Sequence, residues 1–310
     1  MNILITGSGG YLGGKLVSAL SKKYNIRTVS SLSSDEPLSV NPDISNMKIN
    51  WTCAEDLHNS TKEIDVVIHA FGLNAVGCEK SLNDAYLMNA VYTGNILASA
   101  IENEVKQFIY LSTAHVYGEL FGHITESSLS RSIHPYGSSK RAGEDVVRYL
   151  AGKSKKTNYQ ILRLSNVFGP PFPGNATCWN LLSNDLCLQA YKDNNLQLKT
   201  NGIQSRNFLT MTDFLRVIEH LIMGSHENGI YNVGANKSLT VLEMATLVAE
   251  RYVHMFGRTV TIHKNDADHS KENYINYDCA KLIATDFKFQ NKFVDEIDDI
   301  FNYLAIQNSA

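Results

Sequence analysis

Tyr136 and Lys140 stand four residues apart in the run Pro135-Tyr-Gly-Ser-Ser-Lys140. On a helix this spacing places both side chains on one face. An ammonium group near a phenol favours the phenolate, so we expect Lys140 to lower the pKa of Tyr136 from its ordinary value of about 10. A tyrosine of this kind can serve as an acid or base for a hydroxyl or carbonyl group. Because pairs with this spacing are common, the pair alone does not define a function.

A second hydroxyl group, that of Thr113, gives the pair its context. The segment Gln107-Phe-Ile-Tyr-Leu-Ser-Thr113 is a predicted strand that ends in hydroxyl residues. Thr113 would lie at the carboxyl end of this strand, where it can hydrogen-bond a reacting oxygen and share its proton with Tyr136. The three residues together favour oxidation or reduction at an alcohol carbon.

The chain also has a glycine pattern suited to a dinucleotide. An apolar strand from Ile3 leads directly into glycines at 7, 10 and 13, and an apolar helix follows. Gly7 permits a tight turn, Gly10 lets the backbone approach a pyrophosphate at the helix N-terminus, and Gly13 lets the helix pack close to the strand. A plain tight turn is the alternative reading of such a pattern.

A nucleoside triphosphate loop is a rival interpretation of the same residues. Gly9 to Lys15 matches its Gly-x-x-x-x-Gly-Lys pattern, but the next residue is Leu16. That loop needs a Ser or Thr there to hold magnesium, so we reject this interpretation.

Composition narrows the class of protein. The chain has 310 residues and a net charge of −3, which argues against a non-specific nucleic-acid binder. Its five cysteines are scattered without CxxC spacing, which predicts reduced thiols and neither a disulfide framework nor a metal site. No apolar run approaches the roughly 18 residues that span a bilayer, so we expect a cytoplasmic protein without a membrane partner.

The first half of the chain alternates strand and helix patterns, which predicts a doubly wound parallel α/β sheet of the Rossmann type. Residues 31–47 are predicted to form a polar loop. The expected helices cover 11–22, 83–101 and 136–151, and the expected strands cover 3–6, 26–30, 48–51, 65–70, 107–113 and 159–164.

The pattern changes after the proline-rich stretch 169–174. A helix near 177–193, strands near 196–199 and 206–211, a helix from the Thr240–Glu243 capping box to 256 and a helix near 294–305 are expected. We therefore divide the chain into a dinucleotide-binding domain at 1–165 and a smaller α/β lobe at 166–310, interleaved with the first, that binds substrate.

The motifs in their order resemble the extended short-chain dehydrogenase/reductases, in the branch of NAD-dependent nucleotide-sugar epimerases and dehydratases. The resemblance covers nearly the whole chain. It rests on Thr6-Gly-x-x-Gly-x-x-Gly13, His69-Ala70, Asn89-x-x-x-x-Gly94, Ser112-Thr-Ala-His-Val-Tyr-Gly118, Pro135-Tyr-Gly-Ser-Ser-Lys140, Arg163-Leu-Ser-Asn-Val-Phe-Gly-Pro170 and Arg206-Asn-Phe-Leu followed by Asp213.

This resemblance implies roles for individual residues. Tyr136 would be the general acid/base, Lys140 would tune it and hold the nicotinamide ribose, and Thr113 would occupy the Ser/Thr position of the family. Asn166 and Arg206 would contact the diphosphate of the substrate, for which an arginine offers bidentate hydrogen bonds. The residues expected to contact the cofactor, in addition to Tyr136 and Lys140, are Gly7, Gly10, Tyr11, Leu12, Gly13, Ser30, Ser31, Ala70, Phe71, Gly72 and Asn89.

One departure from the family pattern concerns the cofactor. NAD-binding members carry an acidic residue at the end of the second strand, whereas this strand ends Arg27-Thr-Val-Ser-Ser31. Ser30, Ser31 or Ser33 could donate to a 2′-phosphate, and Arg27 could assist if it does not point away. The sequence leans slightly to NADP, with NAD as the alternative.

A second departure concerns the reaction. The family's 4,6-dehydratases follow the threonine with Asp-Glu, and this chain has Ala114-His115. A 4,6-dehydratase is therefore not expected. His115 would shape the sugar pocket or assist proton transfer, and a packing histidine is the plainer alternative.

We thus expect an epimerase that transfers hydride at C4 of a nucleotide-diphosphate sugar. An NADPH-dependent 4-keto-sugar reductase shares all these residues and is the first alternative. A non-catalytic dinucleotide sensor, or the same chemistry on a substrate without a nucleotide, is less favoured. The family resemblance also implies a homodimer.

Overall fold

The computed structural model describes residues 1–31, 44–172 and 177–309. The chain divides into two compact units, each made of segments that alternate along the sequence. Unit 1 comprises Met1–Glu119, Ser128–Arg163 and Glu219–Tyr231, and unit 2 comprises Leu120–Ser127, Leu164–Ile218 and Asn232–Ala310. Unit 2 therefore includes a segment from well before residue 165.

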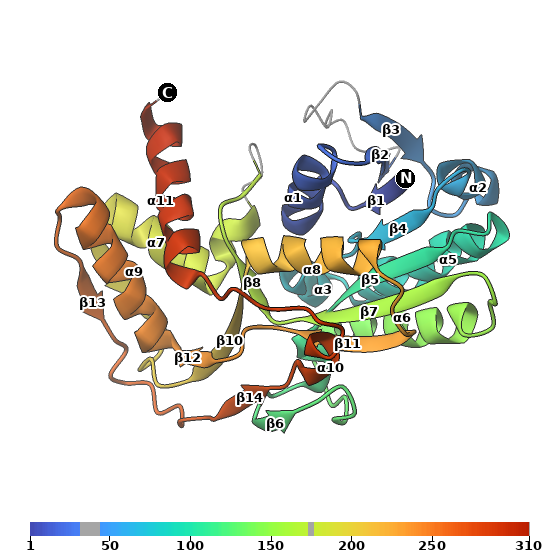
Figure 1. Cartoon of the computed structure of the whole chain (residues 1–310). Helices are drawn as coiled ribbons and strands as arrows, with labels where there is room; N and C mark the ends of the chain where they lie inside the picture. The colour runs from blue at the N-terminus through green and yellow to red at the C-terminus, as the bar shows by residue number, and fades with distance from the viewer. Residues whose placement is uncertain (32–43, 173–176, 310) are drawn as a thin grey trace. The chain divides into compact units, whose positions relative to one another are not determined.

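A seven-stranded sheet forms the centre of unit 1 (Figure 1). Its order is β11-β7-β5-β4-β1-β2-β3, so the chain proceeds outward from β1 in both directions. β1 pairs in parallel with both β2 and β4, and the reversal of order between β1 and β4 is where open α/β sheets bind ligands. The predicted Rossmann-type α/β fold is confirmed. The strands are β1 Asn2–Thr6, β2 Asn25–Ser31, β3 Ser45–Ile49, β4 Val66–His69, β5 Gln107–Thr113, β7 Asn158–Leu164 and β11 Gly229–Val233.

Burial explains why these segments form the central strands. All four residues of β4 and all seven of β5 are buried, as expected for parallel strands covered on both faces. The described helical segments that belong to unit 1 are α1 Tyr11–Leu20, α2 Ala54–Thr61, α3 Ala75–Lys80, α4 Leu82–Tyr86, the π-helix η1 Leu87–Val91, α5 Tyr92–Glu102, the 3₁₀ turn η2 Ala114–Tyr117 and α6 Pro135–Ala151.

Unit 2 combines small sheets with a helical core. Strands β12, β10 and β8 form one sheet, and β13 pairs with β9 and β14 with β6. The predicted capping box opens α9: Thr240 and Glu243 each bond the other's backbone N–H. Buried apolar residues of α7, α9 and α11 form one cluster. The elements are β6 Gly122–Ile124, β8 Asn166–Phe168, η3 Thr177–Asn180, α7 Leu182–Asp193, β9 Asn195–Gln197, β10 Ser205–Thr210, β12 Ser238–Thr240, α9 Val241–Phe256, β13 Thr261–His263, β14 Ile275–Tyr277, α10 Ala280–Ile283 and α11 Phe293–Ser309.

Two sequence-based boundaries around β3 were wrong. Residues 45–47, predicted to lie in a loop, form β3 with Lys48 and Ile49, because this segment pairs in register with β2. The expected strand at 48–51 ends at Ile49, and Trp51 lies in the following turn. The rest of the predicted loop, at 32–43, lies outside the described residues.

The helix expected over 83–101 is three consecutive segments, α4, η1 and α5. The π-helical turn contains Asn89, whose side chain is fully buried. Such turns are rare and often mark functional sites. The sequence analysis also missed several elements entirely: α2, α3, α8 Met211–Met223, α10, β6, β8, β11, β12, β13 and β14.

Candidate active site

The turn after β1 has the geometry of a dinucleotide-binding loop. Gly7 has φ +69°, and its carbonyl accepts a hydrogen bond of 3.0 Å from the N–H of Gly10, which caps α1. A Cβ on Gly13 would lie 2.1 Å from Gly7 O, so only glycine lets α1 pack this close to the turn. The hydroxyl of Ser8 is buried without a hydrogen-bond partner among the described residues. A close-packed backbone cradle with an unused donor fits a pyrophosphate.

The turn after β4 touches this loop and leads to Lys140. A Cβ on Gly7 would lie 2.6 Å from Phe71 N, so the two turns are in contact. A Cβ on Gly72 would lie 2.4 Å from Asn89 Oδ1 and 3.0 Å from Lys140 Nζ. The segment 70–72 thus connects the glycine loop with the lysine of the predicted catalytic pair.

Asn89 holds that segment in place. Its Oδ1 accepts the N–H of Leu73 at 2.8 Å, and its Nδ2 donates to Leu73 O at 3.3 Å and to Ser139 Oγ at 2.9 Å. The amide is therefore used within the protein, between the segment after β4 and helix α6. Its expected contact with a cofactor stays a prediction.

Thr113, Tyr136 and Lys140 all lie in unit 1, on two neighbouring elements. Thr113 ends β5, and the interaction of its hydroxyl with the Tyr136 phenol acts to lower the pKa of that phenol. Helix α6 begins at Pro135, and Nδ1 of His134 accepts the N–H of Tyr136 at 3.1 Å. Lys140 is 5% exposed and donates to Leu111 O at 3.1 Å.

The predicted effect of Lys140 on Tyr136 was wrong. Burial raises the pKa of Tyr136 to about 12, and the hydrogen bond with Thr113 offsets this only in part. Burial also lowers the pKa of Lys140 to about 8, while Cys78 and Glu144 oppose that shift. The ammonium is directed to a carbonyl of β5, and loss of water around the phenol is the largest cause of the raised pKa of Tyr136. Near neutral pH the Tyr136 side chain of the protein alone is therefore a proton donor.

His115 lies beside the phenol. Its side chain is exposed, and its ring meets the Tyr136 ring edge-on with centroids 5.8 Å apart. The Thr113 hydroxyl accepts the backbone N–H of His115 at 3.2 Å, which fixes the start of η2. The imidazole thus lies next to the phenol of the predicted catalytic pair.

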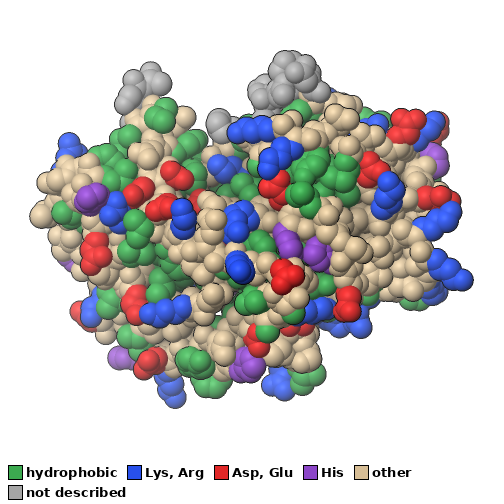
Figure 2. All heavy atoms as spheres, viewed as in Figure 1, with side chains coloured by type: hydrophobic (Ala, Val, Ile, Leu, Met, Phe, Trp, Pro, Cys, Tyr) green, Lys and Arg blue, Asp and Glu red, His purple; other side chains and the backbone are tan. Residues whose placement is uncertain are grey.

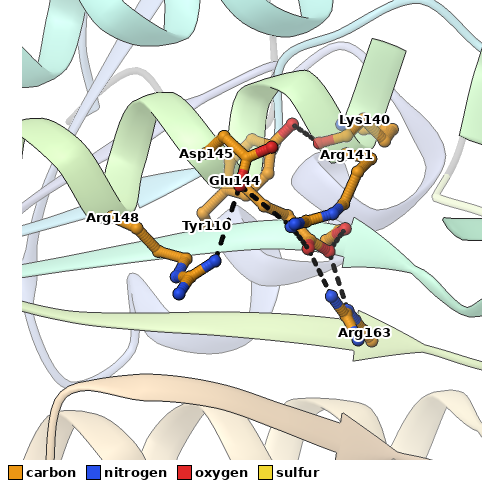
Figure 3. A network of polar contacts seen from close by, with 8 residues as sticks. Tyr110, Lys140, Arg141, Glu144, Asp145, Arg148 and Arg163 are labelled. Atoms are coloured by element: carbon orange, nitrogen blue, oxygen red, sulfur yellow. Dashed lines mark hydrogen bonds and ion pairs between the residues drawn. The ribbon is translucent and has the colours of Figure 1, made fainter. Parts of the chain in front are cut away.

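A buried ion pair behind Lys140 was missed by the sequence analysis. Arg163 on β7 donates through Nε and Nη2 to the two oxygens of Glu144, at 3.0 and 2.7 Å (Figure 3). Ser112 Oγ donates to Glu144 Oε1 at 2.5 Å. The network ties α6 to β5 and β7. Glu144 follows Lys140 by four residues and so lies on the same face of the helix. This spacing is the feature of the sequence from which the role of Glu144 could have been predicted.

Breaking this pair is expected to destabilise the fold. Glu144→Gln leaves the Arg163 cation, 2% exposed, without its counter-charge. Removing one partner of a buried pair costs about 3–5 kcal/mol. Asp145→Asn is the matched control on the same helix, since Asp145 pairs with Arg141 and Arg148 in an exposed position and should change stability by less than about 1 kcal/mol. Urea unfolding measures both, and equal midpoints for the two variants would contradict the assignment.

His69 is the buried titratable group at the end of β4. It is 0% exposed, and burial together with the charge of Lys140 lowers its pKa to about 3. Below its ordinary value of about 6.5, the unfolded chain binds a proton that the folded protein does not. Stability should thus be complete above pH 6.5 and fall by up to about 1.4 kcal/mol per pH unit toward pH 3 from this group.

Urea midpoints at pH 7.5, 6.5 and 5.5 test this pH dependence. His69→Asn should be less stable at pH 7.5 but show a shallower decline, whereas His254→Asn, at an exposed position, should retain the wild-type slope. The same slope in all three proteins would show that His69 does not contribute.

The end of β2 is where the sequence suggested contacts to a 2′-phosphate. Arg27 does point away: its Nη1 donates to Ser60 O at 3.0 Å and Lys62 O at 2.7 Å. The Ser31 hydroxyl accepts Trp51 Nε1–H at 3.1 Å, and Ser30 Oγ lies 3.5 Å from the amide of Asn46. The remaining predicted cofactor residues of the loop, Tyr11 and Leu12, open α1 and are half-buried.

The predicted diphosphate ligands lie in unit 2. Asn166 begins β8 and donates to Asn207 O at 2.7 Å. Arg206 is exposed on β10, and its register partner on β12 is Leu239. β8 and β10 pair in parallel with Asn166 opposite Phe208, so the two predicted ligands are on neighbouring strands.

The surface gives two further observations. On the face shown in Figure 2, basic and acidic side chains are interspersed rather than gathered into a single-charge stripe. Within 1–31, 44–172 and 177–309, every helix is too short or too polar to cross a bilayer.

The fold is of the Rossmann type, and α6 holds a tyrosine–lysine pair next to the end of β5. The sequence profile of the NAD dependent epimerase/dehydratase family matches residues 3–234, and the chain belongs to this family.

Known relatives include both epimerases and dehydratases. An uncharacterised UDP-glucose epimerase of Bacillus subtilis (strain 168) is 25% identical over 86% of this chain and 85% of its own length. A dTDP-D-glucose 4,6-dehydratase of Bos taurus is 26% identical over 89% of this chain and 77% of its own. Among solved structures, a UDP-glucuronic acid 4-epimerase from Bacillus cereus in complex with UDP-glucuronic acid and NAD superposes with a TM-score of 0.82 at 22% identity, covering 99% of this chain and 100% of the other.

Proposed function

We propose that this chain is an epimerase that inverts C4 of a nucleotide-diphosphate sugar by removing hydride and returning it to the other face. The placement of Thr113 at the end of β5 and of Tyr136 and Lys140 on α6, with Lys140 bonded to Leu111 O of β5, carries the proposal. Family membership and the presence of UDP-sugar epimerases among the relatives support it.

Each of the three residues has a defined task. Tyr136 in its ionised form takes the proton of the C4 hydroxyl during oxidation, and in the protonated form that it has in the protein alone it donates a proton during reduction. Thr113 hydrogen-bonds the same oxygen, and Lys140 binds the ribose next to the nicotinamide and keeps a positive charge behind the phenol. When bound, the nicotinamide ring supplies the hydride acceptor and donor.

Substrate contacts form the second part of the proposal. Arg206 is exposed and suited to bidentate hydrogen bonds with a diphosphate, and Asn166 on the neighbouring strand adds an amide. His115 would contact the sugar beside Tyr136. The homodimer implied by the resemblance stays a prediction that sedimentation measurements can test.

The choice between NAD and NADP also stays a prediction. Ser30 and Ser31 are at the end of β2 as the slight lean to NADP requires, but Arg27 is bonded to carbonyls elsewhere. The family's name favours NAD. Calorimetric titration with each dinucleotide separates the two.

A 4-keto-sugar reductase is the second candidate, because the raised pKa of Tyr136 leaves the phenol protonated and ready to donate to a ketone oxygen. We propose against a 4,6-dehydratase, since Ala114 and His115 stand where acid and base would be needed to expel the C6 hydroxyl.

Incubation with UDP-glucose, UDP-glucuronic acid and their dTDP counterparts tests these functions. An epimerase forms the C4 epimer with no net change in absorbance of the nicotinamide. A reductase oxidises NADPH only when a 4-keto sugar is added, and a 4,6-dehydratase releases a 4-keto-6-deoxy sugar. Failure of every sugar to react or to bind would contradict the proposal.

A further inference from the structure

The imidazole of His69 joins two buried threonines that the proposed chemistry does not use. Nδ1 lies 2.9 Å from Thr6 Oγ1 at the end of β1, and Nε2 lies 3.1 Å from Thr93 Oγ1 on α5. The ring stacks on Phe108 and Tyr110, with centroids 5.7 and 5.9 Å away. A polar chain of this length in an apolar core must have every donor matched to an acceptor.

The other hydrogen-bond partners of the two threonines determine which group donates and which accepts in each bond. Thr93 Oγ1 donates to the carbonyl of Asn89 at 3.0 Å, because a carbonyl only accepts. Thr93 therefore accepts from His69, which places the imidazole proton on Nε2.

At the other end, Thr6 Oγ1 accepts a hydrogen bond from the N–H of Phe71 at 3.2 Å. The Thr6 hydroxyl therefore donates its own proton to the unprotonated Nδ1 of His69. The order is thus Phe71 N–H to Thr6, Thr6 to His69, His69 to Thr93 and Thr93 to Asn89 O, each group donating to the next.

Both ends of this series of hydrogen bonds reach the segment that follows β4. One end is the N–H of Phe71 itself, and the other is Asn89, whose side chain holds Leu73 and Ser139. Gly72 lies between them, where a Cβ would be 3.0 Å from Lys140 Nζ. This series of hydrogen bonds, which we call the His69 relay, therefore fixes segment 70–73 at both ends. It thereby fixes the distance between Gly72 and Lys140.

We propose that His69, neutral and protonated on Nε2, is a positioning residue that sets segment 70–73 and Lys140 for the nicotinamide half of the dinucleotide. This inference rests on the proposed function for its role, but its tautomer is a property of the protein alone.

The tautomer is tested by ¹⁵N NMR of histidine-labelled protein at pH 7. The expected spectrum shows His69 with a protonated Nε2 and an unprotonated Nδ1, assigned by its loss in His69→Asn. A proton on Nδ1, or on both nitrogens, would overturn the relay whatever reaction the protein catalyses.

The positioning role is tested by the affinity for NAD and NADP. Thr93→Val removes the hydroxyl with little change in volume, and we expect the Kd for the preferred dinucleotide to rise at least tenfold, while Thr93→Ser restores it to within twofold. Ser99→Ala is the control, because Ser99 is a buried hydroxyl on the same helix that bonds Thr61 outside the relay. The Kd of Ser99→Ala for the dinucleotide should stay within twofold of the wild-type value, even if its melting temperature falls as far as that of Thr93→Val.

The outcomes separate the two claims. If Thr93→Val binds the dinucleotide as tightly as Ser99→Ala does, the positioning role is refuted while the proposed function stands. If the wild type binds neither NAD nor NADP, the proposed function and the role of His69 fail together, and only the tautomer remains.

Discussion

Tyr136→Phe is expected to lower turnover by about a thousandfold, the range that a positioned acid/base group contributes. The substitution removes one hydroxyl and keeps the ring that packs against His115, so the fold should be retained. Steady-state kinetics with the sugar that the wild type accepts measures the effect. The Kd for the dinucleotide should change by less than threefold, since the account assigns Tyr136 to proton transfer.

Tyr149→Phe is the matched control for this substitution. Tyr149 lies on the same helix, α6, but its side chain is exposed, so turnover should equal that of the wild type. If Tyr136→Phe retained turnover as this control does, catalysis through Tyr136 would be excluded. If every measurable effect of the protein survived in Tyr136→Phe, that result would favour a non-catalytic dinucleotide sensor.

Gly13→Ala is expected to have the second largest effect. The added Cβ would lie 2.1 Å from Gly7 O and 2.7 Å from Gly7 C, and both are backbone atoms that no rotamer change can move. Helix α1 or the glycine turn has to shift, at a cost of about 2 kcal/mol or more. If dinucleotide binding becomes less favourable by the same amount of about 2 kcal/mol, the affinity falls about 30-fold.

Gly9→Ala provides the comparison within the same turn. A Cβ on Gly9 would meet nothing within 4 Å, so its urea midpoint should match the wild type. Unfolding curves and calorimetric titration of both variants with NAD and NADP give the result. A Gly13→Ala protein as stable and as tightly binding as the wild type would show that α1 does not pack on the turn as described.

Local rules were sufficient for the elements that surround the proposed cofactor site. The apolar run 3–5 and the glycines at 7, 10 and 13 determine a strand, a turn and a helix within a dozen residues. Pro135 likewise marks the first residue of α6, where it loses no hydrogen bond. Both features were therefore predicted correctly from sequence.

Other elements were missed although their pattern was present. Helix α8 follows directly from β10, and its first residue, Met211, had been assigned to the strand. Its buried positions 214, 217, 218, 221 and 222 nevertheless repeat at helical spacing. The π-helical turn around Asn89 has no comparable signal, because it depends on the tertiary contacts of that side chain with Leu73 and Ser139.

The protonation states could not be predicted from spacing. The sequence places Lys140 one helical turn from Tyr136, but it does not show how much water the phenol loses or that the ammonium bonds Leu111 O. Burial then reverses the expected direction of the Tyr136 pKa. The Glu144–Arg163 pair and the His69 relay are also long-range contacts between strands and helices, and they emerge only from the fold.

The most direct test of hydride transfer at C4 uses nucleotide sugars that carry deuterium on that carbon. The protein is incubated with deuterated UDP-glucose or UDP-glucuronic acid in the presence of NAD or NADP, and NMR follows the sugar. We predict a C4 epimer that retains the deuterium, because hydride leaves and returns at the same carbon. Unchanged configuration at C4 with no transfer of deuterium, for every sugar that binds, would contradict the account.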